Sequence, residues 1–423
     1  MIKKLLDIFQ NKQFHKLSLY GFGQLFNLVT PLLVIPYIVS ICGEENFGKT
    51  AVGMALCFFL MVFIDYGSDL VGVREISINR DDFSQTQRIF ATNYLAKTIL
   101  LSGVLFVCLI LFQTIPFFSA EKKMFLLGLT LLIGQFLNPT WFLQGVENVK
   151  WITFSNIISK SIYLLLIFLF IKEEQDYVLI NLFWGIGMII SNGLFFFLII
   201  KKYKFSFSSI HKKDIFQFLR RDFKMFGSQI FVSIQMYSPV ILISYFGTNL
   251  MAGQYKIVEQ VILIFKTYIL LFFNYVFPNV CYLLEKSKEK GIYNWKLFNG
   301  ANFIFVLVSM VVFYNFSYDI VSYFNPTNRY ALSNLLQLAV FYPVLFAISI
   351  PLKQLVLAWN FNQFYVNLTS IAVLLNIIAI VILLPQFQVY GVFYSLLFIE
   401  GIMILFYLIC IRKKLFSKEE TNQ

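Results

Sequence analysis

The stretch FGKTAVGMALCFFLMVFIDYGSDLVGVREI (Phe47–Ile76) decides how this chain folds. From Phe47 to Val73 it is apolar enough and long enough to cross a bilayer, which takes about 20 residues of helix. It nevertheless carries Asp65 and Asp69, although an acidic side chain at membrane depth costs roughly 2.5–3.5 kcal/mol. Residues four apart share a helix face, so we expect both carboxylates to face protein or a water-filled cavity rather than lipid.

Two interpretations of these carboxylates are open at this point. In the first, both side chains line a charged gate on a transport path. In the second, they mark only a helix end, with Asp69 near the lipid headgroups and Asp65 capping a neighbouring helix. Both interpretations place the stretch in an integral membrane protein.

The composition is that of a chain that crosses the membrane several times. Of the 423 residues, 59% are hydrophobic and only 13% are charged, whereas about 25% of the residues in soluble domains are charged. The five cysteines are scattered and both histidines lie outside the apolar runs, so we expect no disulfide, no metal site and no cofactor. The chain is therefore predicted to be an all-α integral membrane protein and not an enzyme.

The apolar runs predict twelve membrane-spanning helices in two parallel six-helix bundles around a central cationic cavity. Gln24 with Gln229, and Gly48 with Gly253, indicate a repeat with an offset of 205 residues. Transporters built from repeats bind substrate near the midplane between the repeats. The predicted spans are 17–42, 47–73, 89–113, 124–144, 152–171, 177–200, 225–247, 252–284, 298–322, 331–358, 363–384 and 388–411.

These spans divide the chain into five predicted parts. The parts are a cytoplasmic amphipathic N-terminus (1–16), an N-terminal bundle (17–200), a basic cytoplasmic linker (201–224), a C-terminal bundle (225–411) and a cytoplasmic tail (412–423). The linker either lies as an amphipathic strip on the anionic inner leaflet or is a solvated connection between the halves.

The net charge of +12 is an orientation signal rather than a nucleic-acid footprint. With these spans, 24 of the 34 Lys and Arg residues lie on the side of the two termini, and six lie within spans. The opposite side holds only Lys122, Lys123, Lys172 and Arg329. Because basic loops stay in the cytoplasm, we expect a multi-pass protein with both termini in the cytoplasm, and no nucleic-acid partner.

The six basic residues within the predicted spans are all lysines. Three of them lie deep, where a lipid-facing ammonium group is implausible, and we expect them to line the cavity: Lys97, Lys160 and Lys266. The other three lie nearer span ends, where they either join the transport path or extend to the headgroups: Lys49, Lys256 and Lys353. The excess of lysine over carboxylate indicates an anionic cargo, such as a phosphate that must later leave.

The acidic residues suggest a gate or an ion-coupling site. We expect Asp65 and Asp69 to pair with Lys353, Arg220 or Arg221 from the second half, and so to close the cytoplasmic side of the cavity. Such a gate must open in every cycle, so each exposed pair should contribute only about 0–1 kcal/mol. The candidates for gating or ion coupling are Asp65, Asp69, Arg74, Lys353, Glu259 and Glu400.

Three stretches resemble the O-antigen flippase (Wzx-type) branch of the polysaccharide transporters, whose superfamily also contains lipid II flippases and MATE exporters. In FIDYGSDLVGVREISINRDD the matching residues are Asp65, Gly67, Arg74 and Glu75, whereas Ser68 replaces the usual phenylalanine. In NPTWFLQGVENVKWITFSNIISK they are Pro139, Trp141, Phe142, Gln144, Gly145, Glu147 and Lys160. In FGTNLMAGQYKIVEQV they are Gly253 and Tyr255, and Glu259 stands where small residues are common.

The resemblance implies a MOP/MATE-like fold and a specific cargo. That cargo is an undecaprenyl-diphosphate-linked oligosaccharide, an O-antigen or similar repeat unit, which rocking of the two halves would move across the bacterial inner membrane. Coupling to a proton or sodium gradient is implied as well, with the polymerase and chain-length proteins of the same pathway as partners. The diphosphate agrees with the cationic spans.

Two other functions are open alternatives. A MATE-like small-molecule exporter of cationic drugs should have an acid-rich cavity, whereas lysines predominate in these spans. An O-antigen polymerase or ligase usually has a long external loop with arginines, whereas the longest predicted external loop here has about ten residues.

Overall fold

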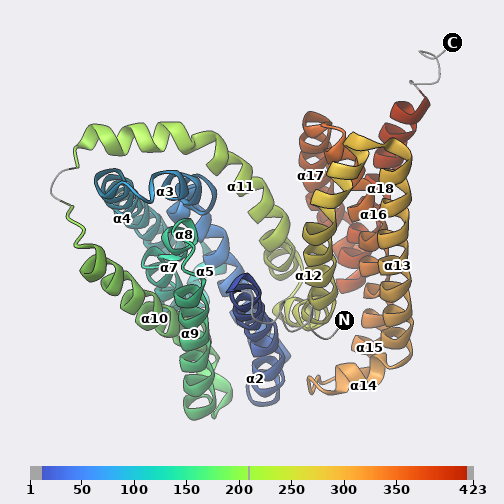
Figure 1. Cartoon of the computed structure of the whole chain (residues 1–423). Coiled ribbons are helices and arrows are strands. Elements are labelled where there is room, and N and C mark those ends of the chain that lie inside the picture. The colour runs from blue at the N-terminus through green and yellow to red at the C-terminus, as the bar shows by residue number, and fades with distance from the viewer. Residues whose placement is uncertain (1–11, 208–209, 417–423) are drawn as a thin grey trace. The chain divides into compact units, whose positions relative to one another are not determined.

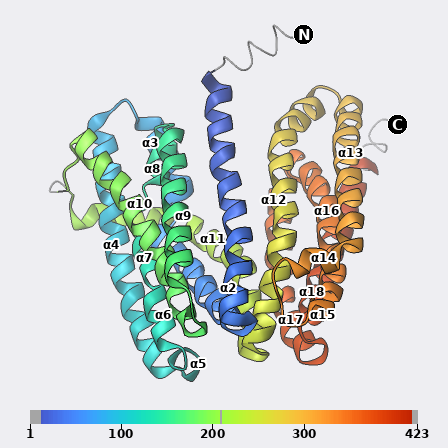
Figure 2. The same cartoon turned by 90° about the horizontal axis from the view of Figure 1, so that it is seen from below.

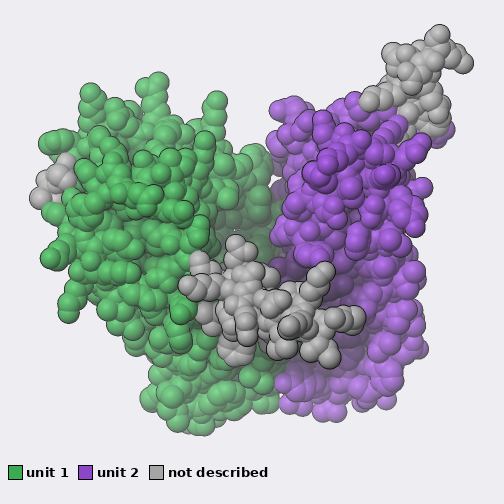
Figure 3. Space-filling model, viewed as in Figure 1, with its two compact units in different colours: residues 1–42, 49–237 green, residues 43–48, 238–423 purple. Residues whose placement is uncertain are grey.

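The computed structural model describes residues 12–207 and 210–416, which form helices joined by short connections (Figure 1). Residues 1–11 of the predicted N-terminus and residues 417–423 of the predicted tail lie outside this description. The chain divides into two compact units (Figure 3). Unit 1 comprises residues 1–42 and 49–237, and unit 2 comprises residues 43–48 and 238–423.

The helices of unit 1 begin with α2, part of which belongs to unit 2, and end with most of α11. They are α2 (Lys12–Asp65), η1 (Ser68–Gly72), α3 (Val73–Asn79), α4 (Phe83–Thr114), α5 (Pro116–Ser119), α6 (Lys122–Gly128), α7 (Thr130–Phe136), α8 (Thr140–Gly145), α9 (Val149–Phe170), η2 (Glu174–Leu179), α10 (Ile180–Tyr203) and α11 (Lys212–Phe246). Those of unit 2 are the end of α11, then α12 (Asn249–Lys286), α13 (Lys288–Asn315), α14 (Ser317–Ser322), α15 (Arg329–Ala339), α16 (Phe341–Ala358), α17 (Asn362–Phe387) and α18 (Val389–Phe416).

Eleven helical stretches in the described ranges are long and apolar enough to cross a membrane. The prediction of an all-α integral membrane protein is therefore confirmed. The stretch Phe26–Asp65 has 40 residues, so a straight helix would be about 60 Å long, twice the roughly 30 Å of a bilayer core. Gly43 interrupts the helical backbone with φ 81° and ψ 164°, a conformation that glycine adopts without strain. The first predicted span and most of the second therefore lie within α2, one on each side of Gly43 (Figure 2). The end of the second predicted span, beyond Asp65, lies outside α2.

Unit 1 is built around an aromatic core. In it, α10 packs against α7 and α9, and α3 packs against α8. Trp141 is 1% exposed, and its ring lies 5.9 Å from that of Phe90, centroid to centroid. A Cβ atom on Gly72 would lie 2.9 Å from the Trp141 ring, so only glycine allows η1 to approach α8 this closely. The first two stretches that carry the family resemblance thus pack against each other in this core.

Unit 2 contains a close contact between the two glycines of the predicted repeat. Here α12 packs against α13 and α16, and α18 packs against α16 and α17. Gly48 of α2 faces Gly253 of α12, and a Cβ on Gly48 would overlap the backbone carbonyl of Asn249. A Cβ on Gly253 would likewise overlap the backbone carbonyl of Glu44. The two backbones approach so closely because neither glycine carries a side chain.

Helix α11 occupies part of the predicted linker. It begins at Lys212 and continues without interruption to Phe246, so residues 212–224 form one helix with the predicted span 225–247. The units divide within this helix, between Tyr237 and Ser238. The part of α11 from Lys212 to Tyr237 therefore belongs to unit 1.

Candidate functional site

A buried ion pair joins the end of α2 to the middle of α4. The Nζ atom of Lys97 lies 3.0 Å from the Oδ1 atom of Asp65, and the two side chains are 1% and 10% exposed. The second carboxylate oxygen of Asp65 accepts a hydrogen bond of 2.7 Å from the Nε2 atom of Gln135. Burying a charge is costly unless it is paired and hydrogen-bonded, and here both oxygens of the carboxylate have a partner.

The expectation that Asp65 and Asp69 share a helix face is wrong. Helix α2 ends at Asp65, and Tyr66 and Gly67 follow with φ angles of 45° and 84°. The chain then resumes as η1, a π-helix that begins at Ser68. The two residues therefore lie on different helical segments, with Asp65 buried and Asp69 exposed, although their carboxylates remain close enough to interact electrostatically. Irregular backbone is tolerated at membrane depth only where protein buries it or a cavity adjoins it.

Ser68 stabilises this break. Its hydroxyl group donates a hydrogen bond to the backbone carbonyl of Asp65. The Nδ2 atom of Asn93 donates to the same hydroxyl at 2.9 Å. Ser68 and Asn93 are 0% and 1% exposed. The residue at which this sequence departs from the usual Gly-Phe pattern therefore takes part in a buried polar contact that a phenylalanine could not make.

Gln135 connects the ion pair to a polar cavity within unit 1. The cavity has a volume of about 300 Å³. Four carboxamides, one lysine and three aromatic rings contribute to its wall, and α4, which carries Lys97, does not. The lining residues are Phe58, Met61, Gln135, Asn138, Asn156, Ser159, Lys160, Trp184, Met188, Asn192 and Tyr237.

Lys160 is the single cation of this lining. Its Nζ atom lies 3.5 Å from the centroid of the Trp184 ring, a geometry in which the ring face attracts the ammonium group. Within the described residues no carboxylate lies within 4.0 Å of this nitrogen. Lys97 and Lys160 therefore differ in their partners: Lys97 is paired with Asp65, and Lys160 rests on the Trp184 ring.

The lysines of unit 2 show the same two arrangements: one is paired with a carboxylate, and another rests on an aromatic ring. The Nζ atom of Lys256 lies 2.6 Å from Glu259, which also accepts a hydrogen bond of 3.1 Å from the hydroxyl of Tyr255. Lys266 instead lies over the Tyr342 ring, at 5.1 Å. In the described part of unit 2, Lys266 has no carboxylate within 4.0 Å.

Lys353 and Glu400 complete the predicted charges of unit 2. Lys353 lies 4.7 Å from the centroid of the Tyr365 ring. Glu400 is partly buried on α18 and interacts electrostatically with Lys266 and Lys353. Unit 2 therefore holds two lysines over aromatic rings. Both interact electrostatically with Glu400, and Lys266 also interacts with Glu259.

Lys49 is held by a separate cluster in unit 1. Its Nζ atom lies 2.8 Å from Glu121, and the hydroxyl of Tyr177 donates a hydrogen bond of 2.6 Å to the other oxygen of the same carboxylate. Lys49 does not line the cavity around Lys160. Of the predicted cavity lysines in unit 1, Lys160 lines this cavity, whereas Lys49 and Lys97 lie in separate ion pairs.

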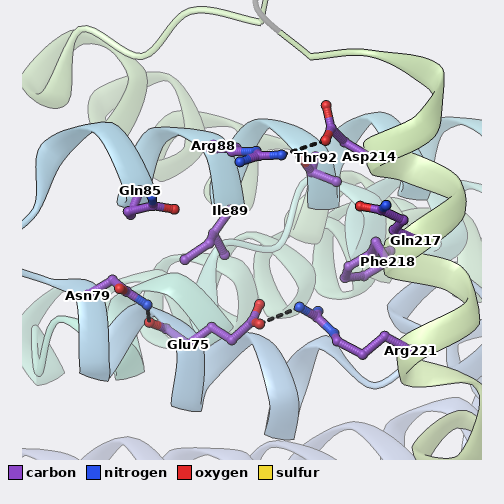
Figure 4. Close-up of a pocket in the computed structure, with 10 residues that line it drawn as sticks. All are labelled: Glu75, Asn79, Gln85, Arg88, Ile89, Thr92, Asp214, Gln217, Phe218 and Arg221. Atoms are coloured by element: carbon purple, nitrogen blue, oxygen red, sulfur yellow. Dashed lines mark hydrogen bonds and ion pairs between the residues drawn. The ribbon is translucent and has the colours of Figure 1, made fainter.

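The basic residues of α11 do not pair with Asp65 or Asp69. Arg221 contacts Glu75 of α3 and holds Asp222 through two hydrogen bonds of 2.6 and 3.0 Å. Arg88 of α4 reaches Asp214 at 2.6 Å. Figure 4 shows these pairs bridging α11 to α3 and α4, around a groove of about 390 Å³. The expected partner Arg221 is therefore paired within unit 1, with Glu75.

Glu75 is one of the two carboxylates that line this groove. Partial burial raises the pKa of its carboxyl group above the ordinary value, and the positive charge of Arg221 opposes the shift. Arg74, the adjacent residue, is exposed and lines the neighbouring groove with Lys224. The groove thus balances two acidic against two basic side chains, and the balance depends on contacts with α11.

Sequence reasoning missed the carboxamides of the cavity. Uncharged polar residues are common in membrane helices, so their presence in a span does not by itself indicate a site. Asn156 offered a signal, because it precedes Lys160 by one helical turn and therefore lies on the same face of α9. Gln135 and Asn192 lie on α7 and α10, so only the fold brings them to this face.

Comparisons with known proteins agree with this architecture. The family model described as polysaccharide biosynthesis protein matches residues 15–283. Two curated relatives, from Escherichia coli strain K12 and Shigella dysenteriae, carry the provisional name of O-antigen transporter. They are 21% and 24% identical over 266 and 272 residues, which is 63% of this chain in both cases and 64% and 67% of the relatives.

Two solved structures share the fold over nearly the whole chain. One is a MATE-family multidrug resistance transporter of the MOP superfamily in an inward-facing conformation. It has a TM-score of 0.72 and 14% identity, covering 98% of this chain and all of the other. The second is the lipid II flippase MurJ in an inward closed conformation, with a TM-score of 0.73 and 17% identity, covering 93% and 87%. At these identities the likeness concerns the fold, which is of the MOP type.

Proposed function

Because this chain belongs to the polysaccharide biosynthesis protein family, we propose that it is a flippase for an undecaprenyl-diphosphate-linked oligosaccharide. It moves the O-antigen or a similar repeat unit across the bacterial inner membrane by alternating access. Both termini lie in the cytoplasm, and the polymerase and chain-length proteins of the pathway receive the product. The two bundles predicted from the sequence are the moving parts.

The observation that carries this proposal is the unpaired Lys160 in a polar cavity among membrane-spanning helices. An ammonium group at this depth is costly unless it faces a polar partner. Trp184 supplies one such contact, and a phosphate group is a stronger one, because hydrogen bonds between ionised groups are about twice as strong as neutral ones. A compact, mobile ammonium group also suits an anion that must be released after translocation.

The positions of the other lysines refine the predicted diphosphate site. Lys97 is less suited to cargo binding than Lys160, because Asp65 already neutralises it and almost none of its surface is accessible. Lys256 is similarly neutralised by Glu259. Lys266 resembles Lys160 in resting on an aromatic ring rather than on a carboxylate. We therefore assign diphosphate binding to Lys160 in unit 1 and Lys266 in unit 2.

The same reasoning applies to coupling with a proton or sodium gradient. A coupling carboxylate must exchange its ion with water, and Asp69 is exposed whereas Asp65 is held by Lys97 and Gln135. Asp69 is therefore our candidate carrier in unit 1. In unit 2 Glu400 is preferred to Glu259, whose carboxylate already binds Lys256 and Tyr255.

The proposal is tested in cells of the source strain that lack this chain. Such cells should accumulate lipid-linked oligosaccharide and lose the surface polysaccharide, and the wild-type chain should reverse both effects. Lys160→Ala should restore neither at normal protein level, and Lys160→Arg should restore them in part. Lys290→Ala, at an exposed position of α13, is the matched control and should behave as the wild type.

The outcome also separates the alternatives. Normal surface polysaccharide in cells without the chain would refute the flippase assignment. If those cells instead became sensitive to cationic drugs, the chain would be a small-molecule exporter with the MATE-type fold. Accumulation of polymerised but unattached polysaccharide would indicate a ligase.

A further inference from the structure

We infer that a basic groove between α3 and α11 binds the phosphate group of an anionic phospholipid from the cytoplasmic leaflet. All the residues that line this groove belong to unit 1, and none of them lines the cavity around Lys160. The site is independent of the cargo. Three features carry the inference: the pairing of the charged side chains in the groove, their level in the membrane, and the distribution of charge around α11.

The basic groove has a volume of about 530 Å³, within the range of about 300–1,000 Å³ for small-molecule sites. Side chains of η1, α3 and α11 form its wall. It adjoins the groove of Figure 4, because Glu75 and Arg221 line both. Its charged lining residues are the basic Arg74, Arg221 and Lys224 and the acidic Glu75 and Asp222.

Two of the three basic side chains in this groove have no carboxylate partner. Arg221 contacts Glu75 and holds Asp222 through hydrogen bonds of 2.6 and 3.0 Å, so one guanidinium group engages both acidic side chains. Within the described residues no carboxylate lies within 4.0 Å of a side-chain nitrogen of Arg74 or Lys224. The charge of Arg74 also acts on the adjacent Glu75, but Arg221 makes the direct contact. The lining thus has an excess of one positive charge, which one phosphodiester group neutralises through strong, charge-assisted hydrogen bonds.

The two unpaired cations lie where predicted spans meet the membrane surface. Arg74 is the first residue after the predicted span 47–73, and Lys224 is the last residue before the predicted span 225–247. In the orientation that the basic loops indicate, both of these span ends face the cytoplasm. Basic pockets between membrane helices on this side are typical sites for the headgroups of anionic lipids.

Apolar side chains beside the two cations suit the acyl chains of a lipid. Val71, Ile78 and Met225 belong to the lining, and Ile78 is 68% exposed. Leu70 and Phe223, which adjoin lining residues in the sequence, are 54% and 62% exposed. A soluble phosphate ion would use only the cations of this groove, whereas a phospholipid uses both the cations and the apolar side chains.

The charges of α11 are divided in the same sense. Both acidic residues of the segment 212–224 are paired with arginines: Asp214 with Arg88 and Asp222 with Arg221. The opposite stripe of the helix is exposed and carries only basic and aromatic side chains, at a helical spacing. These residues are Lys212, Lys213, Phe216, Arg220, Phe223 and Lys224. An anionic bilayer surface is the partner that such a stripe fits.

The test measures lipid binding to the purified full-length protein in a neutral detergent at low salt. The probes are dioctanoyl phosphatidylglycerol, dioctanoyl phosphatidylcholine and inorganic phosphate. Phosphatidylglycerol should bind more tightly than phosphatidylcholine, which has no net charge, and than inorganic phosphate, which has no acyl chains. Arg74→Gln and Lys224→Gln should each weaken the binding of phosphatidylglycerol roughly 5-fold. The same lipid should raise the unfolding temperature of the wild type more than that of either variant.

The matched control is Lys213→Gln, because Lys213 is exposed on the same helix but does not line the groove. It should leave the affinity for phosphatidylglycerol unchanged, and Arg74→Lys, which keeps the charge, should retain most of the binding. Thermal unfolding of each variant without lipid checks that it folds. Equal losses in Lys213→Gln and Lys224→Gln would show only a diffuse attraction between α11 and anionic lipid, and would overturn the site. Equal binding of phosphatidylcholine, or of inorganic phosphate, would overturn an anionic phospholipid as its ligand.

Discussion

Lys97 and Asp65 form an ion pair of 3.0 Å in unit 1 although neither was expected to be the partner of the other. The pair closes the broken end of α2 against α4, and Gln135 extends it to the wall of the cavity. The pair therefore contributes both to the stability of unit 1 and to the position of Gln135 in the cavity wall. For this reason it is the first pair to test by mutation.

Removing one member of this pair should destabilise the protein strongly. Lys97→Met or Asp65→Leu leaves an uncompensated buried charge, which costs about 3–5 kcal/mol. The double variant should be less destabilised than the sum of the two, as unfolding in detergent would show. The exposed pair Arg80–Glu147, at 2.9 Å, is the matched control and should contribute less than about 1 kcal/mol. Additive effects of Lys97→Met and Asp65→Leu would mean that the two side chains do not interact.

The contact between Gly48 and Gly253 should tolerate no side chain. Gly48→Ala places a Cβ atom into the backbone carbonyl of Asn249, so we expect a lower unfolding temperature and loss of polysaccharide export. Gly300→Ala, where a Cβ atom meets nothing within 4 Å, is the matched control. It should be neutral or stabilise its helix by about 0.5–1 kcal/mol. Equal behaviour of the two variants would contradict the close approach.

The groove of Figure 4 should give a pH-dependent stability through Glu75. Because burial raises the pKa of Glu75, its contribution to stability is fully present below the pKa of an unfolded glutamate, about 4.3. That contribution is lost as the pH rises through the raised pKa of the folded protein. The difference in unfolding temperature between the wild type and Glu75→Gln, measured across pH, reports this loss.

Arg221 should set the position of that pH window. Its charge lowers the pKa of Glu75, so in an Arg221→Gln background the loss should occur at higher pH. In both the wild-type and the Arg221→Gln background, the unfolding temperature of the protein with Glu75 is compared with that of Glu75→Gln. The difference removes the contribution of all other titrating groups. A window that stays in place, or that moves to lower pH, would show that Arg221 does not act on Glu75.

The topology follows from the basic residues, 24 of which lie on the side of the termini and four on the other. A reporter that is active only outside the cytoplasm should be silent when fused after residue 423 or within residues 205–215. The same reporter should be active near Glu173. Activity of the fusion after residue 423 would overturn the model of twelve spans.

The fold was predictable because hydrophobicity alone sets the length and number of membrane helices. The break after Asp65 was not predicted, because helical periodicity assigns one face to residues four apart and cannot register the positive φ angles of Tyr66 and Gly67. Gly67 was the one signal of a break in the sequence, because glycine adopts positive φ angles without strain. The predicted Gly48–Gly253 relation was drawn from spacing, and their contact emerges only in the folded chain.

The candidate site was predicted in part. The depth of Lys160 in its predicted span indicates a position on a polar cavity, and Lys160 does line one. The depth of Lys97 predicts the same position, but Lys97 is paired with Asp65, which lies 32 residues away in the sequence. No local sequence pattern relates two such positions. The carboxamides Gln135 and Asn192 come from separate helices. Which side chains form ion pairs, and which line a cavity, depends on tertiary packing. No short sequence motif specifies either.

Transbilayer movement of the cargo in vesicles tests the central claim most directly. Lipid-linked oligosaccharide is extracted from cells that lack this chain, labelled with a fluorophore on its terminal sugar, and reconstituted with the purified protein. A membrane-impermeant quencher then reports the fraction that reaches the outer leaflet. We predict nearly complete quenching with the wild-type chain under an imposed ion gradient, and about half with Lys160→Ala or without protein. Quenching of only about half with the wild-type chain would contradict the account.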